Sequence, residues 1–447
     1  PGLVFSGWEN KKIVSGRLGF WPMGYKFDVA ASDIGYGITY VVSGSPDSQG
    51  GVYLSLIYGD GDKMRNTIIA SEPNGFSHIV WNGLEYGVIW PNQFARLDNK
   101  GKKLQGNVEI VGFSAEKSEE FRVVWNGSGY TIFWLTDGYA PRLTFIDDKG
   151  ATLFSNVPVS TDSIYGSVGR DIVLTSGGGL NAIAWADSRS GQYQTYAALF
   201  DNSGNKLTSD IPVSNEKCKG DVDQRCYPTH IFYDGESESF NLVWRSSQYR
   251  NPKEYFSKIG IDGVVIGDPI LVLNDQNVRQ GSWANSGSEY VALWSDDFLT
   301  RESRLPFLRF DNLGNRLGES LGVIDPAAAY LGTKAINSPM IVSGFGKYAA
   351  FWLDNRNYSD GNRDIYFATP AEPTVPKPII DPSTVCPNGS FACEDFESYS
   401  VGSLAGGEGG AGWGNAWNNV NADAEVVKDG CFKGSKCIKS IDGSVGR

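Results

Sequence analysis

The stretch NAIAWADSRSGQYQTYAALFDNSGNKL, residues 181–207, contains one full version of a pattern that recurs along this chain of 447 residues. An apolar run ends in Trp185, and the polar loop ADSRSGQYQ follows it. A second apolar run leads into a turn that opens on Asp201 and carries Gly204. Asp side chains close such turns by accepting backbone hydrogen bonds, and Gly adopts the positive φ that many of them need. The stretch therefore predicts two antiparallel strands and a tight turn.

An aromatic residue ends the equivalent apolar run in seven places, at an interval of about 50 residues, which is typical of propeller blades. These residues are Tyr40, Trp90, Trp134, Trp185, Trp244, Trp294 and Trp352. A Gly-containing turn precedes most of them and an Asp-containing turn follows, so each repeat predicts four strands, A to D. Four-stranded sheets repeated around an axis form a β-propeller. We expect an all-β fold with seven blades.

The two ends of the propeller are expected to meet in one blade. The seventh repeat stops after its strand C, at residues 363–370, and residues 11–15, KKIVS, are similar to the strand D segments of other repeats. We expect the N-terminal strand to close the ring. The predicted organisation is a propeller over residues 1–369, a Pro-rich linker over 370–385 and a partial β-sandwich-like segment over 386–447.

Charge and cysteine content restrict the partners and the compartment. The formal net charge of −12, with no basic run, argues against nucleic acid, and no apolar run is long enough to span a membrane. The cysteines form three close pairs, which predict local disulfides: Cys218 with Cys226, Cys386 with Cys393, and Cys431 with Cys437. Zinc is the alternative, but Cys-x-x-Cys is absent and the two histidines, His78 and His230, lie far from five of the six cysteines. Disulfides predict an extracellular or cell-surface protein.

The alternation of strand direction predicts where a ligand binds. The A–B and C–D turns share one face, and the B–C loops, which differ between blades, lie on the other; variable loops on a rigid scaffold usually carry binding. The candidate ligand-binding residues are Asp137, Asp187, Arg189, Arg245, Asp296, Asp354 and Arg356. They either order their own loops through hydrogen bonds and ion pairs or ring the mouth of the channel. Loop tyrosines such as Tyr193 could stack on sugars.

The last B–C loop, DNRNYSDGNRD, is dense in hard oxygen ligands. It contains Asp354, Asn357, Asp360, Asn362 and Asp364, and calcium takes six to eight such oxygens. The loop lacks the spacing of an EF-hand, so a solvated acidic loop is the alternative. Calcium is the only cofactor that the sequence indicates.

The sequence does not establish catalysis. A glycosidase needs two carboxyl groups at a fixed separation, and Asp137, Asp187, Asp296, Asp297 and Asp354 are the candidates. No Ser/His/Asp arrangement is visible, and His78 and His230 fall in strand A positions, where a packed or hydrogen-bonded role is usual.

Two resemblances bear on the class of protein. Residues 1–369 resemble secreted bacterial seven-bladed propeller proteins with a GxxYxxxW-x-D-x-R blade pattern. From residue 386, the segments EDFESYSVGSL, GWGNAW and CFKGSKCIKS are similar to the start of a concanavalin-like, laminin-G-like jelly-roll module. That resemblance implies carbohydrate binding, and no binding residues can be transferred from it.

These observations favour an exported, non-catalytic recognition or adhesion protein that binds a glycan or an extracellular protein through its B–C loops. A polysaccharide-degrading enzyme with paired carboxylates on that face is the first alternative. The second is a structural subunit of a surface layer or filament that assembles through the C-terminal segment.

Overall fold

In the computed structural model the chain forms two compact units, residues 1–373 and residues 374–447. The structure describes residues 8–14, 27–42, 50–71, 75–113, 121–136, 140–160, 172–214, 218, 225–247, 252–274, 281–294, 305–318, 321–323, 336–354, 364–370, 402–403, 424–427 and 437–440. Within these ranges no helix could cross a bilayer.

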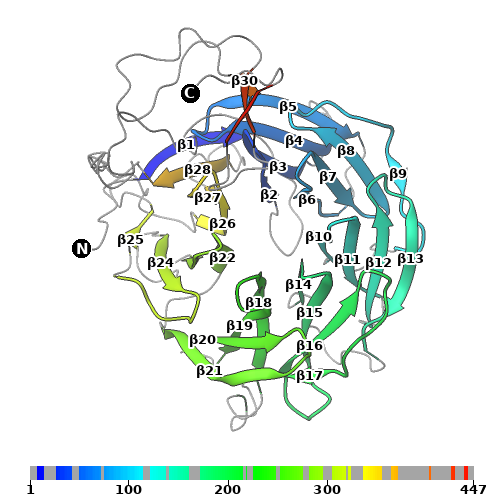
Figure 1. Ribbon diagram of the computed structural model, residues 1–447, viewed down its shortest axis with the longest axis vertical. Helices are drawn as coiled ribbons and strands as arrows, with labels where there is room; N and C mark the ends of the chain where they lie inside the picture. Colours follow the sequence, from blue (N-terminus) through cyan, green and yellow to red (C-terminus); the bar gives the residue numbers. More distant parts are fainter. Residues whose placement is uncertain are drawn as a thin grey trace. The chain divides into compact units, whose positions relative to one another are not determined.

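The first unit is a seven-bladed β-propeller, as predicted (Figure 1). Blade 1 holds β2 (Phe27–Ala31), β3 (Gly35–Val42), β4 (Gly51–Tyr58) and β5 (Lys63–Ala70); blade 2 holds β6 (His78–Trp81), β7 (Glu85–Trp90), β8 (Gln93–Asp98) and β9 (Val108–Glu109); blade 3 holds β10 (Phe121–Trp125), β11 (Gly129–Leu135), β12 (Pro141–Asp147) and β13 (Thr152–Pro158). Blade 4 holds β14 (Ile172–Gly177), β15 (Leu180–Asp187), β16 (Gln194–Asp201) and β17 (Ile211–Pro212); blade 5 holds β18 (Arg225–Asp234), β19 (Ser239–Ser247), β20 (Lys253–Gly260) and β21 (Val265–Asn274); blade 6 holds β22 (Gly281–Asn285), β23 (Glu289–Trp294), β24 (Pro306–Asp311) and β25 (Leu321–Gly322). In each of these six blades the first strand lies nearest the axis of the ring (Figure 1).

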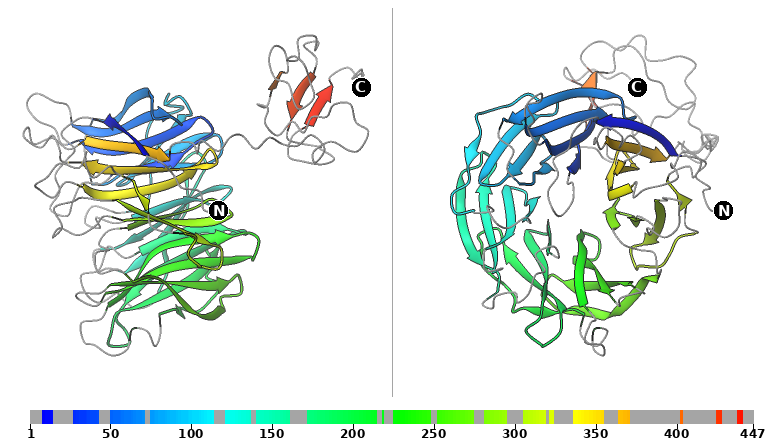
Figure 2. Two further views of the ribbon diagram at one scale, coloured as in Figure 1. Left: turned by 90° about the vertical axis from the view of Figure 1, so that its left-hand side faces the viewer. Right: turned by 180° about the vertical axis from the view of Figure 1, so that it is seen from behind.

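Blade 7 is built from both ends of the propeller, which confirms the predicted closure. It holds β26 (Ile336–Gly344), β27 (Lys347–Asp354) and β28 (Asp364–Pro370), and β1 (Trp8–Val14) adds the outer strand in the order β1-β28-β27-β26. The β1–β28 pairing is antiparallel, with Trp8 opposite Pro370 and Val14 opposite Ile365. Figure 2 shows β1 lying along β28. The first and last blade segments of the sequence are thereby joined without a covalent link.

The turns between strands C and D, most of which contain Asp, pack blades 1 to 6 each against the preceding blade. In blade 3, Asp147 Oδ1 accepts hydrogen bonds from the backbone N–H groups of Lys149 and Ala151, at 2.9 and 2.7 Å. Gly150, with φ of 92°, lies so close to blade 2 that an added Cβ would be 2.4 Å from Phe94 Cδ1. The equivalent glycines of five other blades also lie against the preceding blade: Gly61, Gly101, Gly204, Gly263 and Gly314.

Blade 7 has no such turn, because its outer strand comes from the other end of the chain. Trp8 of β1 takes that place at the interface with blade 6. Its ring is 8% exposed and meets Phe307 of β24 edge to face, with 5.4 Å between ring centroids. Trp8 belongs to one buried cluster with Val291, Leu293 and Trp352. The N-terminal strand therefore seals a blade interface as well as completing a sheet.

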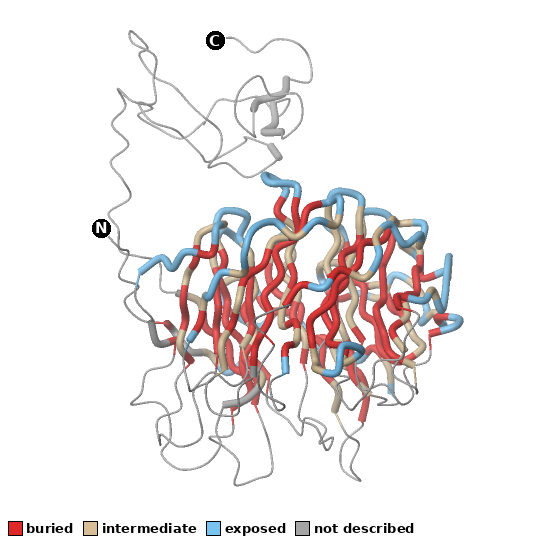
Figure 3. Tube along the Cα trace, turned by 90° about the horizontal axis from the view of Figure 1, so that it is seen from below, coloured by how far each residue is buried: buried red, intermediate tan, exposed pale blue. Residues whose placement is uncertain are grey.

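The core lies between neighbouring blades rather than at the axis. Phe133 and Phe145 of blade 3 form one buried cluster with Ile183, Trp185 and Phe200 of blade 4. Figure 3 shows the strands buried through the middle of the ring, with exposed turns along one edge. Burial of large apolar side chains at every blade interface is the main stabilising contribution.

In the second unit, the described residues form a three-stranded antiparallel sheet in the order β29-β30-β31. The strands are β29 (Gly402–Ser403), β30 (Ala424–Val427) and β31 (Cys437–Ser440).

Candidate functional site

The candidate site is the face of the propeller that carries the B–C loops. The A–B turns are uniformly short, for example residues 82–84 and 126–128, whereas the B–C connections range from residues 91–92 to residues 295–305. The B–C loop of blade 4, residues 188–193, lies wholly in the described part of the chain. It therefore gives the most direct view of how these loops are built.

Asp187 and Arg189 form an internal brace in this loop. Asp187, 1% exposed, ends β15, and its Oδ1 accepts a hydrogen bond from the backbone N–H of Arg189 at 2.8 Å. Its Oδ2 accepts a second one from Arg189 Nε at 2.8 Å and a longer one from Trp185 Nε1 at 3.4 Å. The Trp-x-Asp-x-Arg pattern thus orders its own loop, which is the first of the two roles that the sequence left open.

Arg189 also links its loop to the end of blade 3. Its Nη1 donates to Asp210 Oδ2 of blade 4 at 2.7 Å. Its Nη2 donates at 2.8 Å to Oγ of Ser160, which follows the last strand of blade 3. Burial alone would lower the pKa of Arg189, but hydrogen bonds to Asp187 and Asp210 outweigh it and raise that pKa. The guanidinium lies 4.7 Å from the ring centroid of Tyr196. Arg189 is therefore held by several partners, and its charge is balanced locally.

In blade 5 the structure places Arg245 inside the scaffold. Its side chain is 6% exposed, and its Nε donates to Glu254 Oε1 at 3.0 Å; Arg245 Nη2 contacts the same oxygen. Glu254 Oε2 accepts a hydrogen bond from Trp283 Nε1 of blade 6 at 3.1 Å. Removing one partner of such a buried pair is strongly destabilising. Through Trp283, Glu254 also links blade 5 to blade 6.

Two buried carboxylates lie opposite each other at the same end of blade 7. Asp354 of β27 pairs in register with Asp364 of β28, and each residue is 3% exposed. Asp354 Oδ2 accepts a hydrogen bond from Trp352 Nε1 at 3.2 Å, repeating the Trp–Asp contact of blade 4. Lys12 Nζ of β1 lies 3.7 Å from Asp364 Oδ2. Both ends of the predicted calcium loop are therefore anchored in the sheet.

The other predicted site residues lie outside the described part of the chain: Asp137, Asp296, Asp297, Arg356, Asn357, Asp360 and Asn362. Among the described residues, no group of three or more His, Cys, Asp or Glu side chains could hold a metal ion. The calcium prediction and the carboxylate-pair prediction are untested at these positions.

A stacked pair of aromatic rings beside the B–C loops was missed by the sequence reasoning. In four blades the aromatic residue that ends strand B lies in register with a tyrosine near the start of strand C, and the two rings stack. The pairs are Tyr40–Tyr53, Trp185–Tyr196, Trp244–Tyr255 and Trp352–Tyr366, with ring centroids 4.5–6.3 Å apart. Aromatic pairs at such distances stabilise beyond their burial. A tyrosine early in the second apolar run of these four repeats was the available signal.

The two histidines belong to a pattern of bonds between the innermost strands. His230 Nε2 accepts a hydrogen bond from the backbone N–H of Trp283 in the next blade, at 3.2 Å. In the same way Asp28 Oδ2 accepts from Ile79 N at 3.0 Å and also contacts His78 Nδ1 at 2.9 Å. The expected hydrogen-bonded role of the histidines is confirmed. Burial, and then the charges of two nearby arginines, lower the pKa of His230 to about 3, which keeps its ring neutral.

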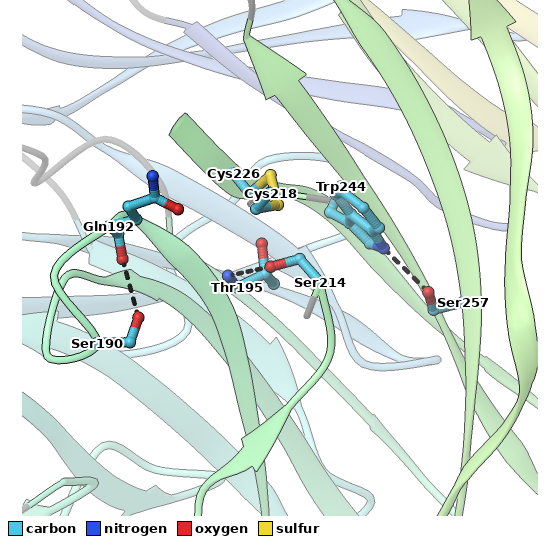
Figure 4. The surroundings of a disulfide bond; sticks show 8 residues. All are labelled: Ser190, Gln192, Thr195, Ser214, Cys218, Cys226, Trp244 and Ser257. Carbon is cyan, nitrogen blue, oxygen red and sulfur yellow. Dashed lines mark hydrogen bonds between the residues drawn. A yellow bond between two sulfur atoms is a disulfide. The ribbon is translucent and has the colours of Figure 1, made fainter. Parts of the chain in front are cut away.

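A disulfide lies between blades 4 and 5 on the face that carries the B–C loops. Cys218 and Cys226 are bonded, as predicted, and both residues are fully buried. The backbone N–H of Cys226 donates to the carbonyl of Tyr193 in the blade 4 loop at 3.0 Å. Figure 4 shows the loop residues Ser190 and Gln192 near the disulfide. The pairs Cys386–Cys393 and Cys431–Cys437 include residues outside the described part of the chain.

No protein-family model matches the chain, and no curated protein shows significant similarity to it. Similar solved structures include the hydrazine synthase of Kuenenia stuttgartiensis, 13% identical over 62% of this chain and 76% of that one, with a TM-score of 0.42. An α-L-arabinofuranosidase of Clostridium thermocellum is 15% identical over 52% and 81%, with a TM-score of 0.33. A subtype N11 neuraminidase-like protein of A/flat-faced bat/Peru/033/2010 (H18N11) is 11% identical over 81% of this chain and 93% of that one, with a TM-score of 0.38. Overlaps this loose carry no inference about function.

Proposed function

We propose that this chain is an exported recognition or adhesion protein that binds a glycan or an extracellular protein through the B–C loop face and does not cleave it. The buried disulfide between Cys218 and Cys226 supports export, because such bonds persist in oxidising compartments. The contrast between short, uniform A–B turns and B–C loops of differing length supports binding at the latter.

The main observation behind this proposal is that the candidate carboxylates in the described residues are buried and hydrogen-bonded to the scaffold. Asp187 is closed off by Arg189 and Trp185, and Asp354 is bonded to Trp352 within the sheet. A glycosidase needs one carboxyl group to donate a proton and another to act as base or nucleophile at an open cleft. Carboxylates that are 1% and 3% exposed and hydrogen-bonded to the scaffold are poorly placed for either role.

A calcium ion held by Asp354, Asn357, Asp360, Asn362 and Asp364 is a separate element of the proposal. The buried carboxylates at the two ends of this loop support it, because oxygen ligands held on rigid strands pay less entropy on binding. Such an ion would order the loop for ligand binding rather than supply chemistry.

The test is a glycan array probed with the purified full chain, once with calcium and once with a chelator. Saturable binding to a defined class of glycans supports the proposal, and its loss on chelation supports the calcium site. Binding that is unchanged by the chelator keeps recognition and removes the ion. An empty array under both conditions refutes glycan recognition and leaves a protein ligand, which crosslinking to surface extracts would then identify.

A further inference from the structure

One cationic side chain on the B–C loop face stands apart from the ion pairs described above. Arg225, the first residue of β18, is exposed, and its guanidinium lies 5.2 Å from the ring centroid of Tyr193. Within the described part of the chain, no carboxylate pairs with it and no other group accepts a hydrogen bond from it. By contrast, Arg189 and Arg245 are bonded to carboxylates. Among the described residues, the guanidinium donors of Arg225 are therefore not engaged by another side chain.

The backbone that carries Arg225 and Tyr193 is held in place. Cys226, directly after Arg225, is bonded to Cys218 and donates its N–H to the Tyr193 carbonyl at 3.0 Å. On the other side of Tyr193, the backbone N–H of Thr195 donates to Ser214 Oγ at 2.9 Å (Figure 4). A contact group supported in this way loses little freedom when a ligand binds.

The ring of Tyr193 orients the guanidinium by a cation–π contact, which leaves the N–H groups at the edge of the guanidinium to meet a ligand. A planar fork of N–H donors matches the two oxygens of a carboxylate or sulfate. The net charge of −12 disfavours a densely charged polyanion. A single guanidinium on an acidic protein suits a ligand that presents one oxyanion at a time.

We propose that Arg225, oriented by Tyr193, is a subsite for the carboxylate or sulfate group of an acidic saccharide. The inference rests on the proposed function, since it names the ligand class for the same face. Arg225 is the contact residue, and Tyr193 is a positioning residue.

The test compares calorimetric binding of three probes to the full chain: a trisaccharide of galacturonic acid, the neutral galactose trisaccharide and a sulfated galactose trisaccharide. Acetate and inorganic sulfate serve as free anions. We expect tighter binding of the acidic sugars than of the neutral sugar and of the free anions. Arg225→Gln should weaken binding of the acidic sugars about 10- to 100-fold, the value of a hydrogen bond to a charged group, and leave the neutral sugar unchanged.

Tyr193→Leu should weaken acidic-sugar binding about 2- to 5-fold, the value of an exposed cation–π contact, and Tyr193→Phe should restore it. A uniform loss for all sugars, or a fall in Tm with Arg225→Gln, would indicate a structural role and overturn the subsite. Equal binding of acidic and neutral sugars would overturn it while leaving glycan recognition intact. Binding of none of the sugars would refute glycan recognition and the subsite with it.

Discussion

Alanine substitutions at two glycines of blade 3 separate two costs in free energy of unfolding: the strain of a positive φ and the loss of tight packing between a turn and the preceding blade. Gly150 and Gly127 have nearly the same φ, 92° and 94°. A Cβ on Gly150 would be 2.4 Å from Cδ1 of the fully buried Phe94, whereas a Cβ on Gly127 would meet nothing within 4 Å. Alanine in the left-handed region costs about 1–2 kcal/mol at either position. At Gly150 overpacking adds about 1–3 kcal/mol.

Gly150→Ala should therefore lower the free energy of unfolding by about 1–3 kcal/mol more than Gly127→Ala does. Urea unfolding followed by tryptophan fluorescence measures both variants, with the m-value checked for two-state behaviour. Equal losses in the two variants would mean that the turn does not pack tightly on blade 2. The interlocking of blades by these turns would then be refuted.

Two further predictions concern ring closure and acid sensitivity. Trp8→Ala should lower the free energy of unfolding by about 3–5 kcal/mol because it leaves a cavity at the interface of blades 6 and 7. The control Leu84→Ala, at a residue 84% exposed, should change it by less than about 0.5 kcal/mol. Similar losses for the two variants in urea titrations would contradict the role of the N-terminal strand in closing the ring. The folded-state pKa of His230 is lowered from 6.5 to about 3. Below pH 6.5 the unfolded chain therefore binds a proton at this residue that the folded protein does not bind, and the free energy of unfolding falls as the pH drops. Between pH 7 and 5.5 this loss is about 1 kcal/mol, and His230→Gln, which can still accept the Trp283 N–H, should abolish it. Identical pH slopes for the variant and the wild type would refute this.

The architecture could be predicted because its signals are local and repeated. The aromatic residue that ends strand B and the Asp-containing turn after strand C recur at a regular interval, and each is fixed by a few neighbouring residues. Strand closure was predictable for the same reason, since residues 11–15 are similar to other outer strands. The insertion of Trp8 against Phe307 was not predictable, because the residues that line one blade interface are distant in sequence.

The roles of the site residues depend on contacts that a linear pattern does not specify. Asp187 and Arg189 could have faced a ligand or each other, and only the folded loop shows that they bond to each other. Glu254 was missed because its pairing with Arg245 depends on strand register across blade 5. The hydrogen bond from Cys226 to Tyr193 joins two blades and leaves no periodic signal.

The measurement that most directly separates recognition from catalysis is the mass of a bound glycan after prolonged incubation with the purified full chain. The best-binding glycan from the array would be incubated at saturating protein, with and without calcium, and recovered for mass spectrometry. We predict an unchanged mass at every time point, together with saturable binding. The appearance of shorter products, and their loss on replacement of Asp137, Asp296 or Asp297 by Asn, would contradict recognition without cleavage and establish the enzyme instead.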